Sequence, residues 1–235
     1  MNRFQLVCCS IVLLMLTTGF NPTQSSLSGG WQLHNGTVTT VLLLQDGYCS
    51  FTEYDLVNRK FLVTYGGVVT MDATTMKVDF EFHSAHPEMV GTTETFAISD
   101  KKVQLTLTGD GKSRTFQRID DNTGDLAGTW RITARMQGEQ MSAMQPGPRK
   151  TLKMLTGTRF QWMAINTQTK EFFGSGGGTY TFANGKYTET IEFFSRDSSR
   201  VGASLSFDGN VSGKVWTHKG LSSKGDPIHE EWTKQ

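Results

Sequence analysis

Residues Gly176–Gly202, GGGTYTFANGKYTETIEFFSRDSSRVG, decide the fold of this chain, because an earlier segment, Tyr65–Gly91, is a diverged copy of them. Every matched pair is separated by the same 111 positions (for example, 192 − 81), so the two segments align without a gap. The chain therefore contains a tandem repeat. The matched pairs are Phe61/Phe172, Gly67/Gly178, Glu81/Glu192, Phe82/Phe193, Ser84/Ser195, Val90/Val201, Gly91/Gly202 and Phe96/Phe207.

The two copies also share a beginning, at a shorter offset. Leu126–Trp130 (LAGTW) matches Leu27–Trp31 (LSGGW) with a separation of 99 (130 − 31). The second copy therefore carries 12 extra residues (111 − 99), which we place in Met136–Lys150. The offset grows again near the C-terminus, which indicates a second, smaller insertion near Leu221–Pro227. Insertions of this kind map to loops.

Residues 1–24 have the features of a secretory signal peptide. Arg3 supplies a positive start, Ile11–Leu16 an apolar run, and Asn21-Pro22 a break. The apolar run is too short for a comfortable membrane span. We therefore expect an exported protein, periplasmic or secreted; the alternative is that this segment stays in place as a membrane anchor.

Charge and cysteine content narrow the classes of partner. The chain has 23 Lys and Arg against 22 Asp and Glu, and loss of Arg3 with the signal would leave 22 against 22. A neutral chain has no bulk electrostatic attraction to nucleic acid, so we exclude a nucleic-acid partner. Since Cys8 and Cys9 lie in the signal, Cys49 would stand alone without a disulfide partner, and we expect it to be a buried apolar side chain.

From Leu27 onward the pattern is one of short strands separated by Gly, Asn and Asp turns. In the first copy we predict strands at Gly30–Leu33, Val38–Leu44, Tyr48–Tyr54, Lys60–Thr70, Met76–His83, Gly91–Ile98, Val103–Thr108 and Arg114–Ile119. Tight connections favour antiparallel hairpins over crossovers. The predicted fold class is all-β, with two tandem antiparallel up-and-down barrels in residues 25–121 and 126–235. Alternation within the fifth strand predicts one shared face for Val78, Phe80 and Phe82.

Each copy begins with Gly-x-Trp and ends with an aromatic residue followed two positions later by a basic one. The pieces are Gly29-x-Trp31 with Phe116-x-Arg118, and Gly128-x-Trp130 with Trp232-x-Lys234. This arrangement resembles lipocalins and their calycin relatives. The second copy is similar to a family of uncharacterised bacterial membrane or secreted lipocalin-like proteins. The resemblance implies a barrel whose Trp plugs one end under a late basic side chain, and it brings no established chemistry.

Aromatic residues of the second copy supply the candidate walls of a ligand pocket. They are Phe160, Trp162, Phe172, Tyr180, Tyr187, Phe193, Phe194 and Trp216. Small-molecule sites are mostly apolar with a few placed polar groups. The alternative is that these rings fill the barrel, because an eight-stranded barrel is just wide enough to be packed solid.

The 12-residue insertion is the candidate lid over such a pocket. Its methionines Met136, Met141 and Met144 are adaptable and would suit an apolar ligand. The alternatives are a plain exposed loop and a thioether site for Cu(I), which the irregular spacing disfavours.

Glu192 with Arg196 and Arg200 is the candidate charged group, since an Arg fork could bind a ligand carboxylate. A solvated Arg pair is the alternative, and the recurrence of Glu81 as Glu192 suits a structural role equally well. No metal, cofactor or catalytic residue is predicted, because no recognised zinc spacing and no G-x-S-x-G motif occurs. The histidines and acids considered for a metal site are His83, His86, His218, His229, Glu230 and Glu231.

The sequence thus predicts an exported, non-enzymatic binding protein for a small apolar or amphipathic molecule, held in the barrel of the second copy. The alternative is a structural or interaction module of the cell envelope that meets a protein or glycan partner. For an enzyme, Glu192 and His229 would be the ionisable pair to inspect.

Overall fold

The computed structural model describes residues 26–235, and the predicted signal peptide at 1–24 lies outside the described residues. The first copy forms β1 (Gly29–Asn35), β2 (Val38–Gln45), β3 (Tyr48–Asp55), β4 (Lys60–Met71), β5 (Thr75–His83), β6 (Thr93–Asp100), β7 (Gln104–Gly109) and β8 (Lys112–Arg118). The second forms β9 (Gly128–Gln137), β10 (Gln140–Ala143), β11 (Arg149–Leu155), β12 (Arg159–Asn166), β13 (Glu171–Ala183), β14 (Lys186–Phe194), β15 (Ser204–Ser212), β16 (Val215–Leu221) and β17 (Pro227–Lys234). Short 3₁₀ turns, η1 (Pro87–Met89) and η2 (Ser198–Arg200), sit at matching places in the two copies.

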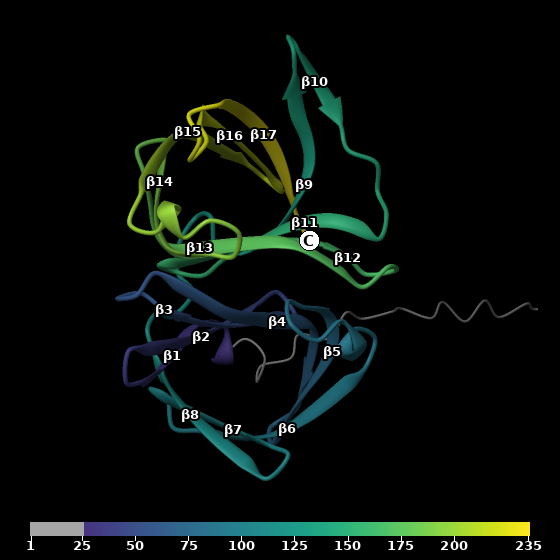
Figure 1. The fold of residues 1–235 in the computed structure, drawn as a ribbon, viewed down its shortest axis with the longest axis vertical. Coiled ribbons are helices and arrows are strands. Elements are labelled where there is room, and N and C mark those ends of the chain that lie inside the picture. Colours follow the sequence, from purple (N-terminus) through teal and green to yellow (C-terminus); the bar gives the residue numbers. More distant parts are fainter. Residues whose placement is uncertain (1–25) are drawn as a thin grey trace, which may run out of the picture.

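The strands close into two antiparallel barrels that follow each other in the chain (Figure 1). In the first, β1 to β8 pair in sequence order and β8 returns to β1. In the second, β9 pairs with both β11 and β17 and so closes an eight-stranded ring. The prediction of an all-β chain with two tandem antiparallel barrels is confirmed.

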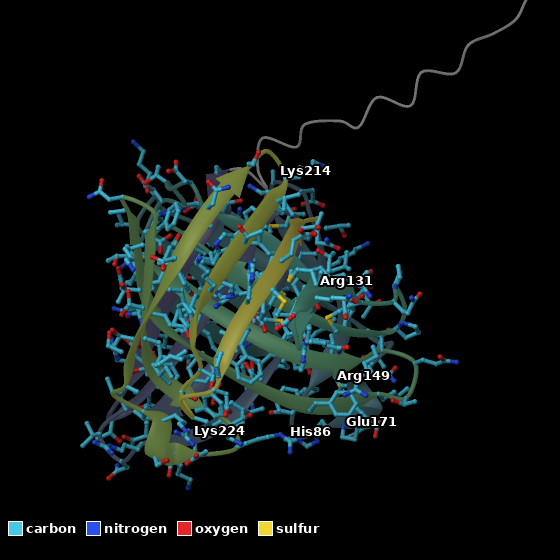
Figure 2. The ribbon with its side chains drawn as sticks, turned by 90° about the horizontal axis from the view of Figure 1, so that it is seen from above. His86, Arg131, Arg149, Glu171, Lys214 and Lys224 are labelled. Carbon is cyan, nitrogen blue, oxygen red and sulfur yellow. The ribbon has the colours of Figure 1, made fainter. Side chains whose placement is uncertain are left out.

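The 12-residue insertion forms an arm on the second barrel. Strand β10 folds back on the outer part of β9, and the loop after it leads to β11 (Figure 1). At the foot of the arm, Arg131 donates to the carbonyl of Gly147 (2.9 Å) and Arg149 lies 4.6 Å from the ring centroid of Phe173. Both arginines appear on the same side of the molecule in Figure 2. The arm is therefore held at its base by cationic side chains.

A tryptophan occupies the same position in each barrel. Trp31 and Trp130 are fully buried, and each indole N–H donates to the carbonyl four residues earlier (2.9 and 2.8 Å). The guanidinium of Arg118 lies 4.0 Å from the ring centroid of Trp31, and the ammonium of Lys234 lies 5.8 Å from that of Trp130. The geometry implied by the doubled Gly-x-Trp is present in both copies.

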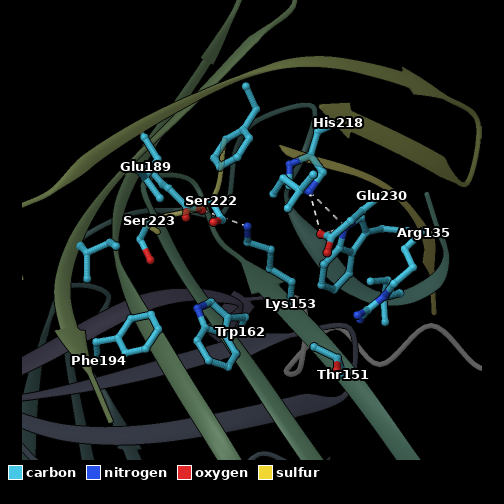
Figure 3. Close-up of a pocket in the computed structure, with 16 residues that line it drawn as sticks. Arg135, Thr151, Lys153, Trp162, Glu189, Phe194, His218, Ser222, Ser223 and Glu230 are labelled. Atoms are coloured by element: carbon cyan, nitrogen blue, oxygen red, sulfur yellow. Dashed lines mark hydrogen bonds and ion pairs between the residues drawn. The ribbon is translucent and has the colours of Figure 1, made fainter. Parts of the chain in front are cut away.

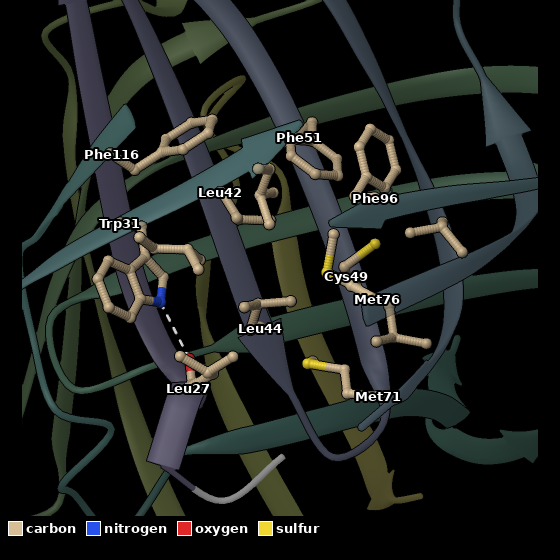
Figure 4. Packing of buried hydrophobic residues seen from close by; sticks show 14 of the residues in the cluster. Leu27, Trp31, Leu42, Leu44, Cys49, Phe51, Met71, Met76, Phe96 and Phe116 are labelled. Atoms are coloured by element: carbon tan, nitrogen blue, oxygen red, sulfur yellow. Dashed lines mark hydrogen bonds between the residues drawn. The ribbon is translucent and has the colours of Figure 1, made fainter. Parts of the chain in front are cut away.

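Apolar side chains fill the interior of the first barrel (Figure 4). Its fully buried members include Trp31, Leu42, Phe51 and Phe116. Cys49 packs among them as a free, buried cysteine, as expected, and burial raises the pKa of its thiol to about 12. An inert, neutral thiol at this depth behaves as a small apolar side chain.

A β-bulge between β4 and β5 reverses the faces of a strand in the first barrel, and a bulge between β13 and β14 matches it in the second. Gly66 pairs with Phe82 and Gly67 with Phe80, so Glu81 is an extra residue on β5. Val78 and Phe80 consequently point into the first barrel, while Phe82 points outward to a different cluster. The prediction that Val78, Phe80 and Phe82 share one face is wrong, because simple alternation does not continue across a bulge.

Glycine is required at these bulges by close backbone approach. A Cβ on Gly67 would lie 2.0 Å from the carbonyl oxygen of Asp79, and one on Gly178 would lie 2.0 Å from that of Thr190. In the second copy Glu192 is the extra residue, opposite Gly177 and Gly178. The repeat match of Gly67 with Gly178 thus has a steric cause.

The outward faces that follow from the bulges pack the two barrels together (Figure 1). Strands β2 to β5 of the first barrel meet β11 to β14 of the second, through side chains that form one buried apolar cluster. Its members are Val41, Leu43, Tyr48, Tyr54, Phe82, Leu152, Met154, Met163, Ile165 and Phe193, with Phe61 and Phe172 packed against them. The repeated pairs Phe61/Phe172 and Phe82/Phe193 therefore belong to the contact between the barrels.

Gln161 forms the polar centre of this contact. Its carbonyl oxygen accepts from Ser50 (2.7 Å) and Thr52 (2.9 Å), and its amide donates to Thr64 (2.9 Å) and Ser175 (3.0 Å). Ser50 is the repeat counterpart of Gln161 (161 − 50 = 111). Equivalent residues of the two copies thus contact each other, as expected on an approximate two-fold axis.

The recurring glutamates also belong to this contact. Each carboxylate receives one donor from its own barrel and one from the other barrel. For Glu81 the donors are Tyr48 (2.7 Å) and Lys150 (2.8 Å), and for Glu192 they are Arg159 (2.5 Å) and Tyr54. The recurrence of Glu81 as Glu192 is therefore explained by the packing of the barrels.

We predict that Gln161→Ala lowers the free energy of unfolding by about 2–3 kcal/mol, because buried hydroxyl partners lose a hydrogen bond. Urea denaturation followed by tryptophan fluorescence measures this loss. Gln168→Ala, in the exposed β12–β13 turn, is the matched control and should change stability by less than about 0.5 kcal/mol. Equal effects of the two variants would contradict the role given to Gln161.

Candidate functional site

The second barrel contains a cavity of about 210 Å³ (Figure 3). Its apolar wall is made by Ile132, Trp162, Ile191, Phe194, Leu205 and Ile228. Arg135 of β9 also lines it, together with four further ionisable side chains from different strands: Lys153 on β11, Glu189 on β14, His218 on β16 and Glu230 on β17. A mostly apolar cavity with a few convergent polar groups is the usual form of a small-molecule site.

Lys153 and Glu189 form a buried ion pair. The ammonium nitrogen lies 2.9 Å from a carboxylate oxygen of Glu189, and the two side chains are only 5% and 8% exposed. The hydroxyl of Tyr187 donates to the same carboxylate oxygen (2.8 Å). Desolvating two charges at this depth is costly, so the ion pair by itself contributes little to the stability of the fold.

Aromatic rings surround the ammonium of Lys153. Its nitrogen lies between 4.7 and 5.9 Å from four ring centroids. The rings belong to Phe160, Tyr187, Trp216 and Trp232. Each ring presents negative charge density from its face to a nearby cation. The second barrel therefore stabilises a positive charge at this point by rings as well as by Glu189.

His218 and Glu230 form a second buried polar pair. His218 Nε2 lies 3.0 Å from a carboxylate oxygen of Glu230, and the indole N–H of Trp232 lies 3.3 Å from the same oxygen. Burial lowers the pKa of His218, so the ring stays neutral and donates from Nε2. Burial raises the pKa of Glu230, but the hydrogen bond to His218 and the charges of Lys153 and Arg135 outweigh it, and the net pKa is lowered. Within residues 26–235, His218 Nδ1 has no hydrogen-bond partner.

The first barrel has apolar residues at three of these four positions. By the repeat register of 111, Leu42, Val78 and Leu107 correspond to Lys153, Glu189 and His218 (153 − 42, 189 − 78 and 218 − 107). All three are buried in the core of the first barrel. Strand pairing supports the alignment, because Leu42 lies opposite Phe51 just as Lys153 lies opposite Trp162. The ionisable groups are therefore a feature of one barrel and are not needed for the fold itself.

Both insertions of the second copy border this region. Ser222 and Ser223, in the β16–β17 loop, line the cavity. The loop after β10 lines a second hollow of about 580 Å³, to which Met144 contributes. Arg135 and Thr151 line both hollows, so the two adjoin. Met141 is exposed on the arm and lines neither hollow, and Met144 does not line the cavity, so the arm stands beside the cavity.

The predicted aromatic wall divides into three groups in the structure. Trp162 and Phe194 line the cavity and contact each other edge to face (5.4 Å between ring centroids). Buried rings fill the barrel around and beyond it: Phe160, Tyr180, Tyr187 and Trp216. Phe172 and Phe193 lie in the contact between the barrels. Two of the eight predicted rings therefore line a cavity, four belong to the packed core, and Phe172 and Phe193 fit neither interpretation.

The predicted charged group is not assembled. Glu192 is engaged at the contact between the barrels, as described above. Arg196 is exposed and donates to the backbone carbonyl of Phe173, while Arg200 pairs with Asp197 (2.9 Å) and donates to the carbonyl of Ser223. No contact links Glu192 to His229 among the described interactions. Arg200 instead holds the loop that carries the cavity residues Ser222 and Ser223.

Lys153 and Glu189 were not found by sequence reasoning. The sequence does contain a signal for them, because both align with apolar residues of the first copy. His218 and Glu230 were considered as metal ligands only. In the part of the chain that the structure describes, no group of three or more His, Cys, Asp or Glu side chains is arranged to hold a metal ion.

The corresponding end of the first barrel differs in its filling. Tyr65 takes the place of Gly176 and stacks on Phe51 (5.1 Å between ring centroids), and its hydroxyl accepts from Arg114 (2.7 Å). The hollow that remains, of about 360 Å³, is lined by Tyr65 and Arg114 together with exposed charged residues such as Lys112. The interior below it is apolar, so the buried ion pair of Lys153 and Glu189 has no counterpart in the core of the first barrel.

Comparison of the sequence with models of known protein families and with curated proteins gives no match. The residues that the structure describes include no helix long and apolar enough to cross a membrane.

We predict that restoring the residues of the first barrel stabilises the protein. The triple variant Lys153→Leu, Glu189→Val, His218→Leu should have a free energy of unfolding that equals that of the native chain or exceeds it by up to about 4 kcal/mol. The reason is that apolar packing replaces buried charges. Lys153→Leu alone should cost about 3–5 kcal/mol, because Glu189 is left buried without its ion-pair partner. Urea denaturation separates the cases, and a triple variant less stable than the single one would refute this reasoning.

We predict that stability falls as the pH drops from about 7.5 to about 5, in part through His218. Its pKa in the folded state lies below the ordinary 6.5, so below that pH the unfolded chain binds a proton that the folded chain does not. His218→Gln, which keeps a donor for Glu230, should flatten this dependence. The pKa of His83 is lowered in the same sense, so the readout is the difference between the native chain and the variant in urea denaturation across the pH range. Parallel curves would contradict the prediction.

Proposed function

We propose that the protein is an exported, non-enzymatic, lipocalin-like binding protein that holds a small amphipathic molecule in its second barrel. One observation carries the proposal: Lys153, Glu189 and His218 are buried around a cavity in one barrel, while the equivalent residues of the other barrel are apolar. Buried ionisable groups at a cavity mark candidate functional sites, because the fold alone gains little from them.

The cavity suggests how such a molecule would lie. Its apolar part would contact Trp162, Phe194 and Leu205, and its polar part would reach the ammonium of Lys153. An apolar cavity of roughly 150 Å³ accommodates one benzene-sized ring, so about 210 Å³ suits a ring with a short substituent or a small bicyclic group. A longer ligand would extend past Arg135 toward the hollow beside the arm.

The lipocalin-like assignment and the export rest on separate supports. Closed eight-stranded antiparallel barrels with a buried Trp beneath a late basic residue agree with the lipocalin resemblance. The composition of residues 1–24 supports export to the periplasm or the medium, with a membrane anchor as the alternative. The pairing of the barrels gives the second one a rigid neighbour, which suits a preformed binding site.

A second candidate function is an interaction module of the cell envelope. The observation in its favour is the arm: within the described residues β10 pairs with β9 alone, so one edge of β10 is open there, and Met141 is exposed on it. An open strand edge can add a strand from a protein partner. A glycan partner would use the exposed Arg149 and the aromatic Phe173 beside it. This function does not explain the buried ionisable groups, so we rank it below ligand binding.

Native mass spectrometry of the protein, purified gently from its own host, tests the proposal. We expect a small molecule bound in a ratio of one to one, released and identified on denaturation, and absent from the triple variant described above. Gln168→Ala, which lies away from the cavity, should retain it. The proposal would be refuted if the triple variant retained the small molecule as well as the native chain does. It would also be refuted if the native chain carried no ligand and small amphipathic compounds did not quench its tryptophan fluorescence.

A further inference from the structure

The ammonium of Lys153 has hydrogen-bonding capacity to spare. An ammonium has three N–H donors, and among the described residues this one makes a hydrogen bond with Glu189 alone. Lys153 lines the cavity, so a molecule held there can reach the remaining donors. The natural complement to an N–H donor is an acceptor oxygen on that molecule.

The charges around the cavity restrict what carries that oxygen. The carboxylates of Glu189 and Glu230 face the same space as Lys153, His218 is neutral, and Arg135 lies at the junction with the outer hollow. A ligand carboxylate beside Lys153 would meet two like charges in a poorly solvated site. A neutral carbonyl oxygen avoids this repulsion and still accepts from the ammonium.

We propose that Lys153 forms a reversible imine with an aldehyde or ketone group of the bound molecule; this inference rests on the ligand-binding function proposed above. The ammonium first gives a proton to Glu189 along their 2.9 Å hydrogen bond, which leaves a neutral amine. The nitrogen lone pair attacks the carbonyl carbon, the carbon–oxygen π bond breaks, and a proton moves from the nitrogen to the new alkoxide oxygen to give a neutral carbinolamine. The carbinolamine hydroxyl then takes the proton from Glu189 and leaves as water, while the nitrogen lone pair forms the carbon–nitrogen double bond.

The balance of this reaction keeps the charge of the site unchanged. An ammonium and a carbonyl compound give a protonated imine and one water molecule, and Glu189 ends as the carboxylate it was at the start. No oxidant or reductant is needed. The protonated imine carries the same positive charge as the ammonium it replaces, so Glu189 serves as its counter-ion in the same way.

The surroundings of Lys153 suit that product. The four rings that lie 4.7 to 5.9 Å from the ammonium nitrogen also stabilise a protonated imine at that point. The lysine side chain is 5% exposed, so little water reaches the imine to hydrolyse it. Leu42, at the equivalent place in the first barrel, has no nucleophile, so only the second barrel can carry out this step.

Reductive trapping tests the proposal on the full folded chain. The protein is incubated with 2-naphthaldehyde and sodium cyanoborohydride, and modified lysines are identified by peptide mass spectrometry. We expect Lys153 to be modified at least about tenfold faster than exposed lysines such as Lys101, because the site holds the carbonyl beside the amine. Modification spread evenly over exposed lysines, with none at Lys153, would overturn the proposal.

Lys153→Arg is the decisive variant, because it keeps the charge and the pairing with Glu189 but cannot form an imine. It should lose the cavity adduct and keep its fold, as judged by its unfolding midpoint. Lys101→Arg is the matched control and should keep the adduct at Lys153.

The alcohol 2-naphthalenemethanol separates this inference from the function beneath it. Binding of the alcohol, seen as quenching of tryptophan fluorescence, without an adduct from the aldehyde would overturn the imine and leave the binding function standing. Binding of neither compound would count against both.

Discussion

The β-bulges at Glu81 and Glu192 are the constraint on which the rest of the structure depends. Each inserts one residue opposite a glycine pair and exchanges the inner and outer faces of the strand beyond it. Without the bulge in β14, Phe193 would continue the inward row of Tyr187, Glu189 and Ile191 and would occupy the barrel. With it, Phe193 joins the contact between the barrels and Phe194 faces the cavity. One local backbone feature thus determines both the pairing of the barrels and the space inside the second.

The paired arrangement lets the two barrels differ in what they bury. The first has an apolar interior, with Leu42, Val78 and Leu107 at the positions that hold Lys153, Glu189 and His218 in the second. Burying those ionisable groups costs stability. The extensive apolar contact between the barrels and the hydrogen bonds of Gln161 offset part of this cost, because the second barrel cannot unfold without exposing that surface. A single barrel with the same interior would lack this support.

The sequence was sufficient to predict the strands, the two barrels and the buried tryptophans, because all three depend on local patterns: alternation, turn residues and a short motif seen twice. It was not sufficient for the direction of the side chains beyond the bulges. Alternation placed Phe82 with Phe80, whereas the pairing of Gly66 with Phe82 reverses its face. The same limit affected the candidate site, since Phe172 and Glu192 were assigned to a pocket and lie between the barrels, while Trp162 and Phe194 do line the cavity. The register between strands depends on residues far apart in the sequence, so it cannot be predicted from the sequence of one strand alone.

Residues that are the same in both copies therefore support the fold, and buried residues that differ between the copies mark the candidate site. Ser84 and Ser195 are residues of the first kind. The hydroxyl of Ser84 accepts from the backbone N–H of Thr64, and that of Ser195 accepts from the equivalent Ser175, both at 2.9 Å. A position with the same role in both barrels remains similar after duplication, whatever the ligand. A position that no longer has this structural role can differ between the copies. A buried lysine at Lys153, where the first copy has Leu42, lowers stability, so we infer that it serves a function other than folding. The lysine, its carboxylate partner and the neutral histidine meet that description at one cavity, and this is why we place the chemistry of the protein there.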